Sequence, residues 1–160
     1  MSEVWVVNAS PLILLARVDR LDLIERLAPG VAVPDAVISE IRAGQHKDAT
    51  ASRALAWTQP HRVPDVPLIP GIEHWDLGAG ESQVIAHCIG RPRWAILDDL
   101  AARRCAAAHG VAVVGTLGVV LRAKKSRHIE HARPVVEALR AAGMFMDNAF
   151  MNDALSRVGE

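Results

Sequence analysis

Acidic side chains stand where predicted strands end and predicted helices begin. Glu81 lies in the first turn of one predicted helix, Asp98 and Asp99 follow the strand expected over residues 94–97, and Glu40 lies on an earlier helix. In open α/β sheets the functional crevice lies beyond the carboxyl ends of the strands, where carboxylates far apart in the sequence converge. Converging carboxylates suit Mg²⁺ or Mn²⁺, which commonly serve phosphoryl chemistry. The sequence therefore predicts a divalent-cation site.

A second interpretation applies to most of these acids taken singly. Asp35, Glu81 and Asp99 are each placed to cap a helix, because a first-turn carboxylate accepts hydrogen bonds from free N–H groups and complements the helix dipole. Glu40 is different, since it lies at the end of its predicted helix, where a carboxylate opposes the dipole. Capping and a shared site both remain open for Glu81 and Asp99.

One position departs from an all-acidic site. The first predicted strand, residues 4–7, ends at Asn8, where such a site would use an aspartate. An amide oxygen can ligate a hard cation, but it brings no charge and cannot act as a base.

The elements that must position these residues alternate between strand and helix patterns, which is typical of a parallel sheet with helices on its faces. Between residues 46 and 77 the pattern loosens into an excursion punctuated by prolines. Strands are expected over residues 4–7, 31–33, 94–97 and 111–114, with a short one near Val63. Helices are expected over residues 10–17, 21–27, 34–41, 49–57, 80–88, 99–109, 115–125, 133–142 and 148–158.

Composition limits the possible classes of protein. The chain has 160 residues, the size of one domain over residues 1–160, and 51% of them are hydrophobic, which excludes a disordered chain. The formal net charge is zero, so any nucleic-acid contact must be local. No signal peptide is recognised, no apolar run reaches about 18 residues, and the two cysteines lack paired spacing. We expect a cytoplasmic protein with no membrane span.

Hydroxyl and basic side chains are further candidates for substrate contacts. Ser10 is placed to cap the first helix or to bind a water molecule beside Asn8, and Thr116 is placed to meet a phosphate at a helix start. A basic stretch of formal charge plus four is either a solvated face or an RNA-backbone contact. Its residues are Arg122, Lys124, Lys125, Arg127 and Arg133, opposed by Glu130.

Four blocks of the chain, residues 7–13, 33–41, 80–85 and 115–124, resemble the PIN-domain superfamily, and within it a family related to the VapC toxins of toxin–antitoxin pairs. The likeness extends over essentially the whole chain. It implies a three-layer α/β/α sandwich with a central, mainly parallel sheet.

The resemblance also implies a function, a metal-dependent endoribonuclease in which acids hold Mg²⁺ or Mn²⁺. By this resemblance, the positions of the acidic site residues of PIN domains correspond in this sequence to Asn8, Glu40, Glu81, and Asp98 or Asp99. The implied partners are RNA, a possible cognate antitoxin and a second copy in a homodimer. The alternative is a catalytically silent PIN-like module that binds RNA or a protein partner, which Asn8 favours.

Overall fold

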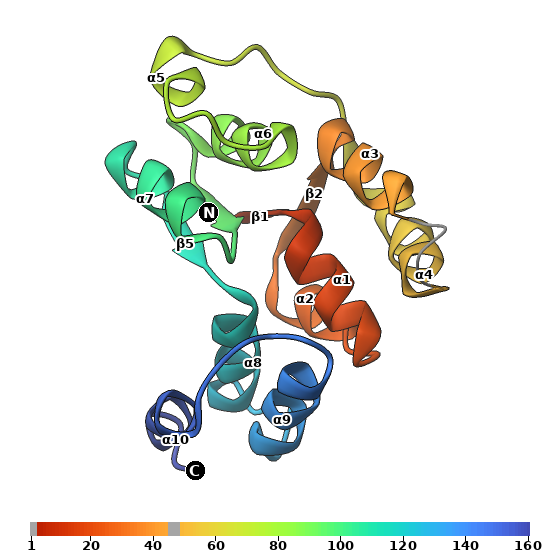
Figure 1. Ribbon diagram of the computed structural model, residues 1–160, viewed down its shortest axis with the longest axis vertical. Helices are drawn as coiled ribbons and strands as arrows, with labels where there is room; N and C mark the ends of the chain where they lie inside the picture. Colours follow the sequence, from red (N-terminus) through yellow and green to blue (C-terminus); the bar gives the residue numbers. More distant parts are fainter. Residues whose placement is uncertain (1–2, 45–48) are drawn as a thin grey trace.

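The computed structural model describes residues 3–44 and 49–160, and within them five strands form one parallel sheet (Figure 1). The strands are β1 (Val4–Val7), β2 (Gly30–Pro34), β3 (Arg62–Val63), β4 (Arg93–Ile96) and β5 (Ala112–Val114). In space they follow the order β3-β2-β1-β4-β5. Val7 pairs with Ile96, so the central strands β1 and β4 end together. The residues that follow these two strands are therefore neighbours at one edge of the sheet.

Helices cover both faces of the sheet. Figure 1 shows α5, α6 and α7 on one side and α1, α2, α8 and α9 on the other, with α3 and α4 beyond β2. This is the expected α/β/α sandwich. None of the described helices is long and apolar enough to cross a membrane. The helices are α1 (Ala9–Arg17), α2 (Asp22–Leu27), α3 (Asp35–Ala43), α4 (Ala49–Thr58), the 3-10 helix η2 (Gln59–His61), α5 (Pro70–Glu73), α6 (Ala79–Cys88), α7 (Leu100–Ala108), α8 (Thr116–Lys125), α9 (Arg133–Ala141) and α10 (Asn148–Ser156).

The strands of the sheet centre are buried on both sides. Val6 and Val7 of β1 and Ala95 and Ile96 of β4 have no exposed surface, because helices pack on both faces of a parallel sheet. The thiols of the described cysteines are buried and unpaired, as expected, and burial raises the pKa of Cys88 to about 12.

Most predicted elements, the first helix among them, are confirmed to within a few residues, but the predicted cap of the first helix is not. The helix α1 begins at Ala9 with Asn8 as its N-cap residue, and no side chain caps it. The prediction that Ser10 caps this helix is wrong, because the Ser10 hydroxyl donates to Asp98 instead. The loosened excursion contains β3 and the one-turn helix α5, and its residues 46–48 lie outside the described residues.

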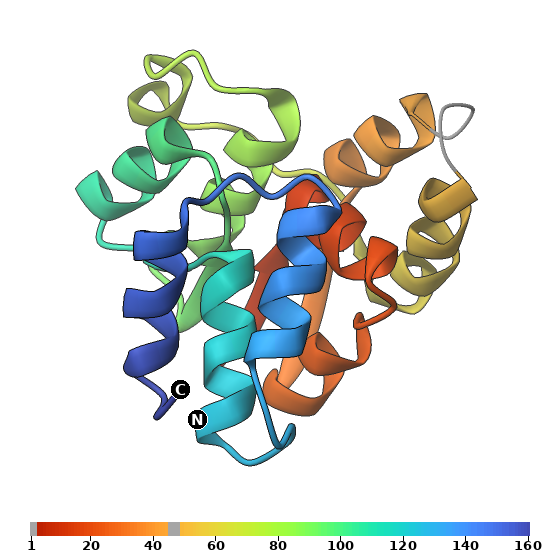
Figure 2. The same ribbon diagram turned by 60° about the horizontal axis from the view of Figure 1, so that its bottom comes forward.

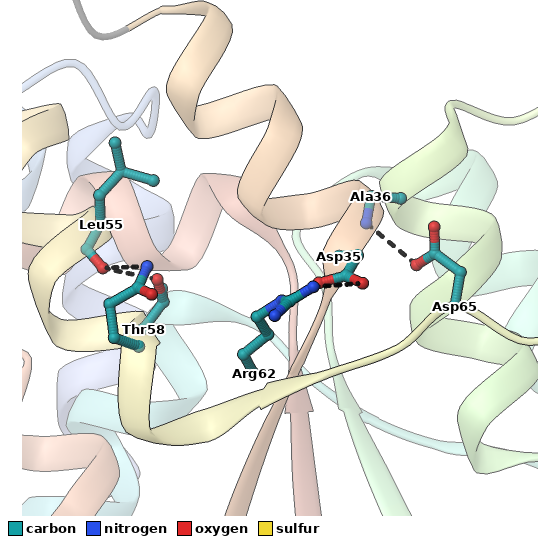
Figure 3. Close-up of polar contacts among 7 residues, drawn as sticks. Asp35, Ala36, Leu55, Thr58, Arg62 and Asp65 are labelled. Atoms are coloured by element: carbon teal, nitrogen blue, oxygen red, sulfur yellow. Dashed lines mark hydrogen bonds and ion pairs between the residues drawn. The ribbon is translucent and has the colours of Figure 1, made fainter.

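The helix that carries Glu40, α3, is fixed by contacts from residues after η2 (Figure 3). Arg62 forms an ion pair with Asp35, and the Asp65 carboxylate accepts a hydrogen bond of 3.0 Å from the backbone N–H of Ala36. The prediction that Asp35 caps α3 is therefore wrong, because Asp65, 29 residues away in sequence, supplies the oxygen for a free N–H. These contacts join the start of α3 to the chain around β3.

Glu160 caps the start of α9 in the same way. Its carboxylate accepts hydrogen bonds from the backbone N–H groups of Ala132 (2.6 Å) and Arg133 (3.1 Å). Burial of this carboxyl group acts to raise its pKa, but the two amide donors and the nearby Lys124 outweigh burial and hold the pKa below its usual value. The charged form of Glu160 therefore stabilises the folded chain.

Glu160→Ala is expected to cost about 1 kcal/mol of stability at pH 7, the usual value of a helix cap, and to lower Tm by a few degrees. Because the folded-state pKa is depressed, this stabilisation is present above the unfolded pKa and is lost as the pH falls through the folded pKa. Melting curves at pH 7 and pH 3 test this, with the exposed Glu130→Ala as control. An equal loss at both pH values would contradict the assigned role of the charge.

Candidate active site

Glu40 and Glu81 come together although they lie on different helices. Glu40 Oε1 accepts a hydrogen bond of 2.8 Å from the backbone N–H of Gly80, in the first turn of α6. One carboxylate oxygen of each residue lies within 3.9 Å of the position that a Cβ atom at residue 78, a glycine, would occupy. Burial, and then the negative charges of Asp99 and Glu40, raise the pKa of Glu81. Negative charge is therefore crowded here, which favours a bound cation.

Gly80 is required by the position of Glu40. A Cβ atom at residue 80 would lie 2.7 Å from Glu40 Oε1 and 2.9 Å from its carboxyl carbon, closer than atoms pack. The Glu40 carboxylate is the far end of a flexible side chain, so it would move while the helices stay in place. Gly80 is thus a positioning residue for Glu40.

Gly80→Ala is therefore expected to displace Glu40 and to lower Mn²⁺ affinity about 10- to 100-fold, the range typical of groups that orient metal ligands. Calorimetric titration with Mn²⁺ measures this directly, and Tm reports whether the fold survives. Gly44→Ala is the control, because its Cβ would meet only the backbone oxygen of Ile41 at an ordinary 3.7 Å. Equal Mn²⁺ affinities for the two variants would refute the positioning role.

Asp98 is held by three donors from α8 and α1. The Thr116 N–H donates to Oδ1 (2.7 Å), while the hydroxyls of Thr116 (2.6 Å) and Ser10 (3.2 Å) donate to Oδ2. Thr116 is fully buried and both of its donors are used by Asp98. The expectation that Thr116 contacts a phosphate is corrected accordingly, because the residue orients a carboxylate instead.

Asp99 caps α7. Its carboxylate accepts a hydrogen bond of 3.0 Å from the backbone N–H of Ala102, so the capping interpretation is confirmed for this residue. Its charge nevertheless reaches the site, since it contributes to the raised pKa of Glu81.

Asn8 provides an oxygen with no partner. Its side chain is 5% exposed, and among the described residues its Oδ1 atom is buried without a hydrogen bond. An unsatisfied buried acceptor costs about 1–3 kcal/mol. Asn8, Ser10, Glu40 and Glu81 line one cavity of about 460 Å³. A cation bound by these oxygen donors would satisfy the amide oxygen, so the donor set fits a hard divalent ion.

The four carboxylates do not form one closed ligand set. Within residues 3–44 and 49–160, no three His, Cys, Asp or Glu side chains are grouped closely enough to hold a metal ion. The reason lies in their separate partners, because Gly80 holds Glu40 at the start of α6 whereas Thr116 holds Asp98 at the start of α8. Asp98 lines an adjoining cavity of about 630 Å³, and Ser10 lines both cavities.

Most of the predicted basic contacts lie away from these acids. Arg122 stacks on Trp94 with its guanidinium carbon 4.6 Å from the ring centre, and the Lys124 ammonium donates to the backbone oxygen of Glu130 (2.6 Å). Lys124 and the exposed Lys125 end α8, whereas Thr116, beside Asp98, begins it. Of the five basic residues predicted as contacts, only Arg122 lines the cavity that contains Asp98.

Three residues of this region were not identified from the sequence. Gly80 makes room for Glu40, and Phe145 and Phe150 line the larger cavity. Two features of the sequence could have indicated these roles. One is a glycine just inside a predicted helix, and the other is the presence of phenylalanines in a polar terminal segment.

In a parallel α/β/α sandwich, acidic side chains beyond the strand ends stand at the functional crevice of the fold. A family model described as a PIN domain matches residues 4–160. The chain therefore belongs to the PIN-domain family, which confirms the resemblance to the PIN-domain superfamily, while the relation to VapC toxins stays a prediction. No match to the chain is found among curated proteins. PIN domains are generally nucleases that use divalent metal ions.

Proposed function

We propose that this protein is an endoribonuclease that depends on Mg²⁺ or Mn²⁺ and hydrolyses RNA phosphodiester bonds. The observation that carries the proposal is the unpartnered, buried Oδ1 atom of Asn8 in a cavity lined also by Glu40 and Glu81. Family membership supports the same chemistry.

Glu40 and Glu81 would hold the cation through carboxylate oxygens, with Asn8 adding a neutral oxygen. Asp98, from the adjoining cavity, and Asp99 would add negative charge nearby. When bound, such a cation stabilises charge on the phosphoryl oxygens and lowers the pKa of water for attack on phosphorus. Asn8 cannot accept a proton from that water, because an amide is not a base at neutral pH.

The protein supplies position as well as charge. Thr116 orients the Asp98 carboxylate through two donors, and Gly80 orients Glu40 through its N–H group. Ser10 is exposed and lines both cavities, so its hydroxyl is available beside Asp98 to contact substrate.

The test is cleavage of an end-labelled single-stranded RNA by the purified protein with Mn²⁺, with Mg²⁺ and with chelator. We expect internal cuts only with a divalent ion, and a Tm that rises with Mn²⁺ concentration through mass action. Cleavage that persists in chelator, or a Tm that ignores Mn²⁺, would refute the proposal.

A second candidate is a catalytically silent PIN-like module that binds RNA or a protein partner. The neutral Asn8 favours it, and so do the separate partners of Glu40 and Asp98. This candidate predicts RNA binding without cleavage at any divalent-ion concentration, which the same assay distinguishes.

We further propose that the nuclease is the toxin of a toxin–antitoxin pair in the cytoplasm, acting as a homodimer. The support is the sequence resemblance to VapC-related proteins. Expression alone should arrest bacterial growth, and coexpression of a small neighbouring gene product should relieve the arrest. Growth without arrest would refute the toxin role while leaving the nuclease proposal to its own assay.

A further inference from the structure

Both phenylalanines of this chain are exposed on one cavity. The sequence contains only two, and Phe145 is 97% exposed while Phe150 is 56% exposed. Both line the cavity of about 630 Å³ that contains Asp98. Large aromatic side chains normally bury their surface, so two exposed rings at one cavity mark a binding surface.

The elements around this cavity bring the rings to the candidate site. Figures 1 and 2 show the segment between α9 and α10 passing over α8 at its first turn, where Thr116 holds Asp98. Phe145 lies in this segment and Phe150 lies in α10. The rings thus extend the Asp98 site outward along the surface.

Positive charge accompanies the rings. Arg103 and Arg122 line the same cavity, and neither forms an ion pair with any residue in the described parts of the chain. A third cation there, Arg157, is already paired with Asp153 at 3.0 Å. Arg103 Nη1 and Asp98 Oδ1 lie 2.8 Å and 3.2 Å from one point, the Cβ position of a side chain at Gly115, so Arg103 is close to Asp98. The lining has three arginines against two aspartates, and this excess of positive charge complements an anionic ligand.

Rings and guanidinium groups together fit one class of ligand, a single-stranded nucleic acid. Unpaired bases stack on aromatic side chains whatever their sequence, while arginines contact the phosphates. A duplex keeps its bases stacked on each other and offers no free face.

We propose that Phe145 and Phe150 form a stacking platform for unpaired bases of RNA next to the phosphate cut at Asp98, with Arg103 and Arg122 contacting the backbone. This proposal rests on the nuclease function above and assigns to it the surface that holds the unpaired strand. The platform sets where the strand lies and does not take part in the chemistry.

The experiment measures binding of a fluorescent single-stranded RNA by anisotropy in chelator, so that cleavage plays no part. Phe145→Ala and Phe150→Ala are each expected to weaken binding about tenfold, the usual effect of losing one base stack. Phe145→Leu should weaken binding similarly, because it keeps apolar surface but removes the ring. Trp75→Leu, which replaces an exposed ring outside this cavity, is the matched control and should leave the RNA affinity unchanged.

Arg103→Gln should weaken binding of all sequences and reduce its salt dependence, as loss of a phosphate contact does. Unchanged affinity in both Phe→Ala variants, or full affinity in Phe145→Leu, would overturn the platform. So would a change of oligomeric mass without a change of RNA affinity, which would assign this face to contacts between copies. The nuclease assay is independent of this binding assay. A wild-type protein whose RNA binding depends on Phe145 but that does not cleave RNA would refute only the proposed nuclease function.

Discussion

Asp98→Asn is expected to lower RNA cleavage at least about a hundredfold while the protein stays folded. Substitution of groups that merely orient a metal ligand already costs about 10- to 100-fold, so loss of the Asp98 charge beside the proposed cation should cost more. The asparagine keeps the shape of Asp98, and its amide can still pair with the Thr116 N–H and hydroxyl. Cleavage rates with Mn²⁺ and melting curves measure the two effects independently.

Asp153→Asn is the matched control for this experiment. Asp153 lines the same cavity but is paired with Arg157, so its loss removes one negative charge without touching the candidate cation site. Cleavage by this variant should stay close to that of the wild type. If Asp98→Asn cuts RNA as fast as the control does, the activity belongs to another site.

Asn8→Asp is expected to lower Tm in chelator. Addition of Mn²⁺ is expected to raise the Tm of this variant more than it raises the Tm of the wild type. The new carboxylate would be buried without a partner beside Glu40 and Glu81, which costs about 2 kcal/mol or more, or roughly 4–8 °C. Cation affinity rises with the number of charged oxygen ligands, so Mn²⁺ should restore the loss.

The control for this variant is Asn152→Asp, since Asn152 is exposed and lies on α10. Melting curves with chelator and with Mn²⁺ for the three proteins give the comparison. If the Mn²⁺-dependent shift of Asn8→Asp is no larger than that of the wild type, Asn8 lies outside the site. If only Asn8→Asp cleaves RNA, the natural protein is the silent module.

The kinds of element and their order follow from the sequence alone. Buried strands such as β1 appear as short apolar runs, and the alternation of strands with helices requires a parallel sheet. Because parallel strands end at one edge, the sequence also predicted that acids from separate segments approach each other there. Glu40 and Glu81 do so, held near Gly78 and Gly80.

The role of each polar side chain was decided only by the tertiary structure. Asp35, Asp99 and Ser10 look alike in sequence, since each stands at a helix start, yet only Asp99 caps its helix. Asp35 forms an ion pair with Arg62, and the Ser10 hydroxyl donates a hydrogen bond to Asp98, which is 88 residues away in sequence. A local pattern states which hydrogen bonds a residue can make, whereas the partner that arrives from a distant segment determines which one it makes.

The composition of the site shows the same division. The sequence by itself determined the oxygen donors, their order along the chain and the neutral Asn8. Only the packing of α8 and α10 decided that Arg122 and both phenylalanines line the cavity that contains Asp98. Lys124, at the far end of α8, instead donates a hydrogen bond to the backbone oxygen of Glu130. Helix spacing specifies the face on which a side chain lies, but the neighbour of that face depends on contacts between segments far apart in sequence.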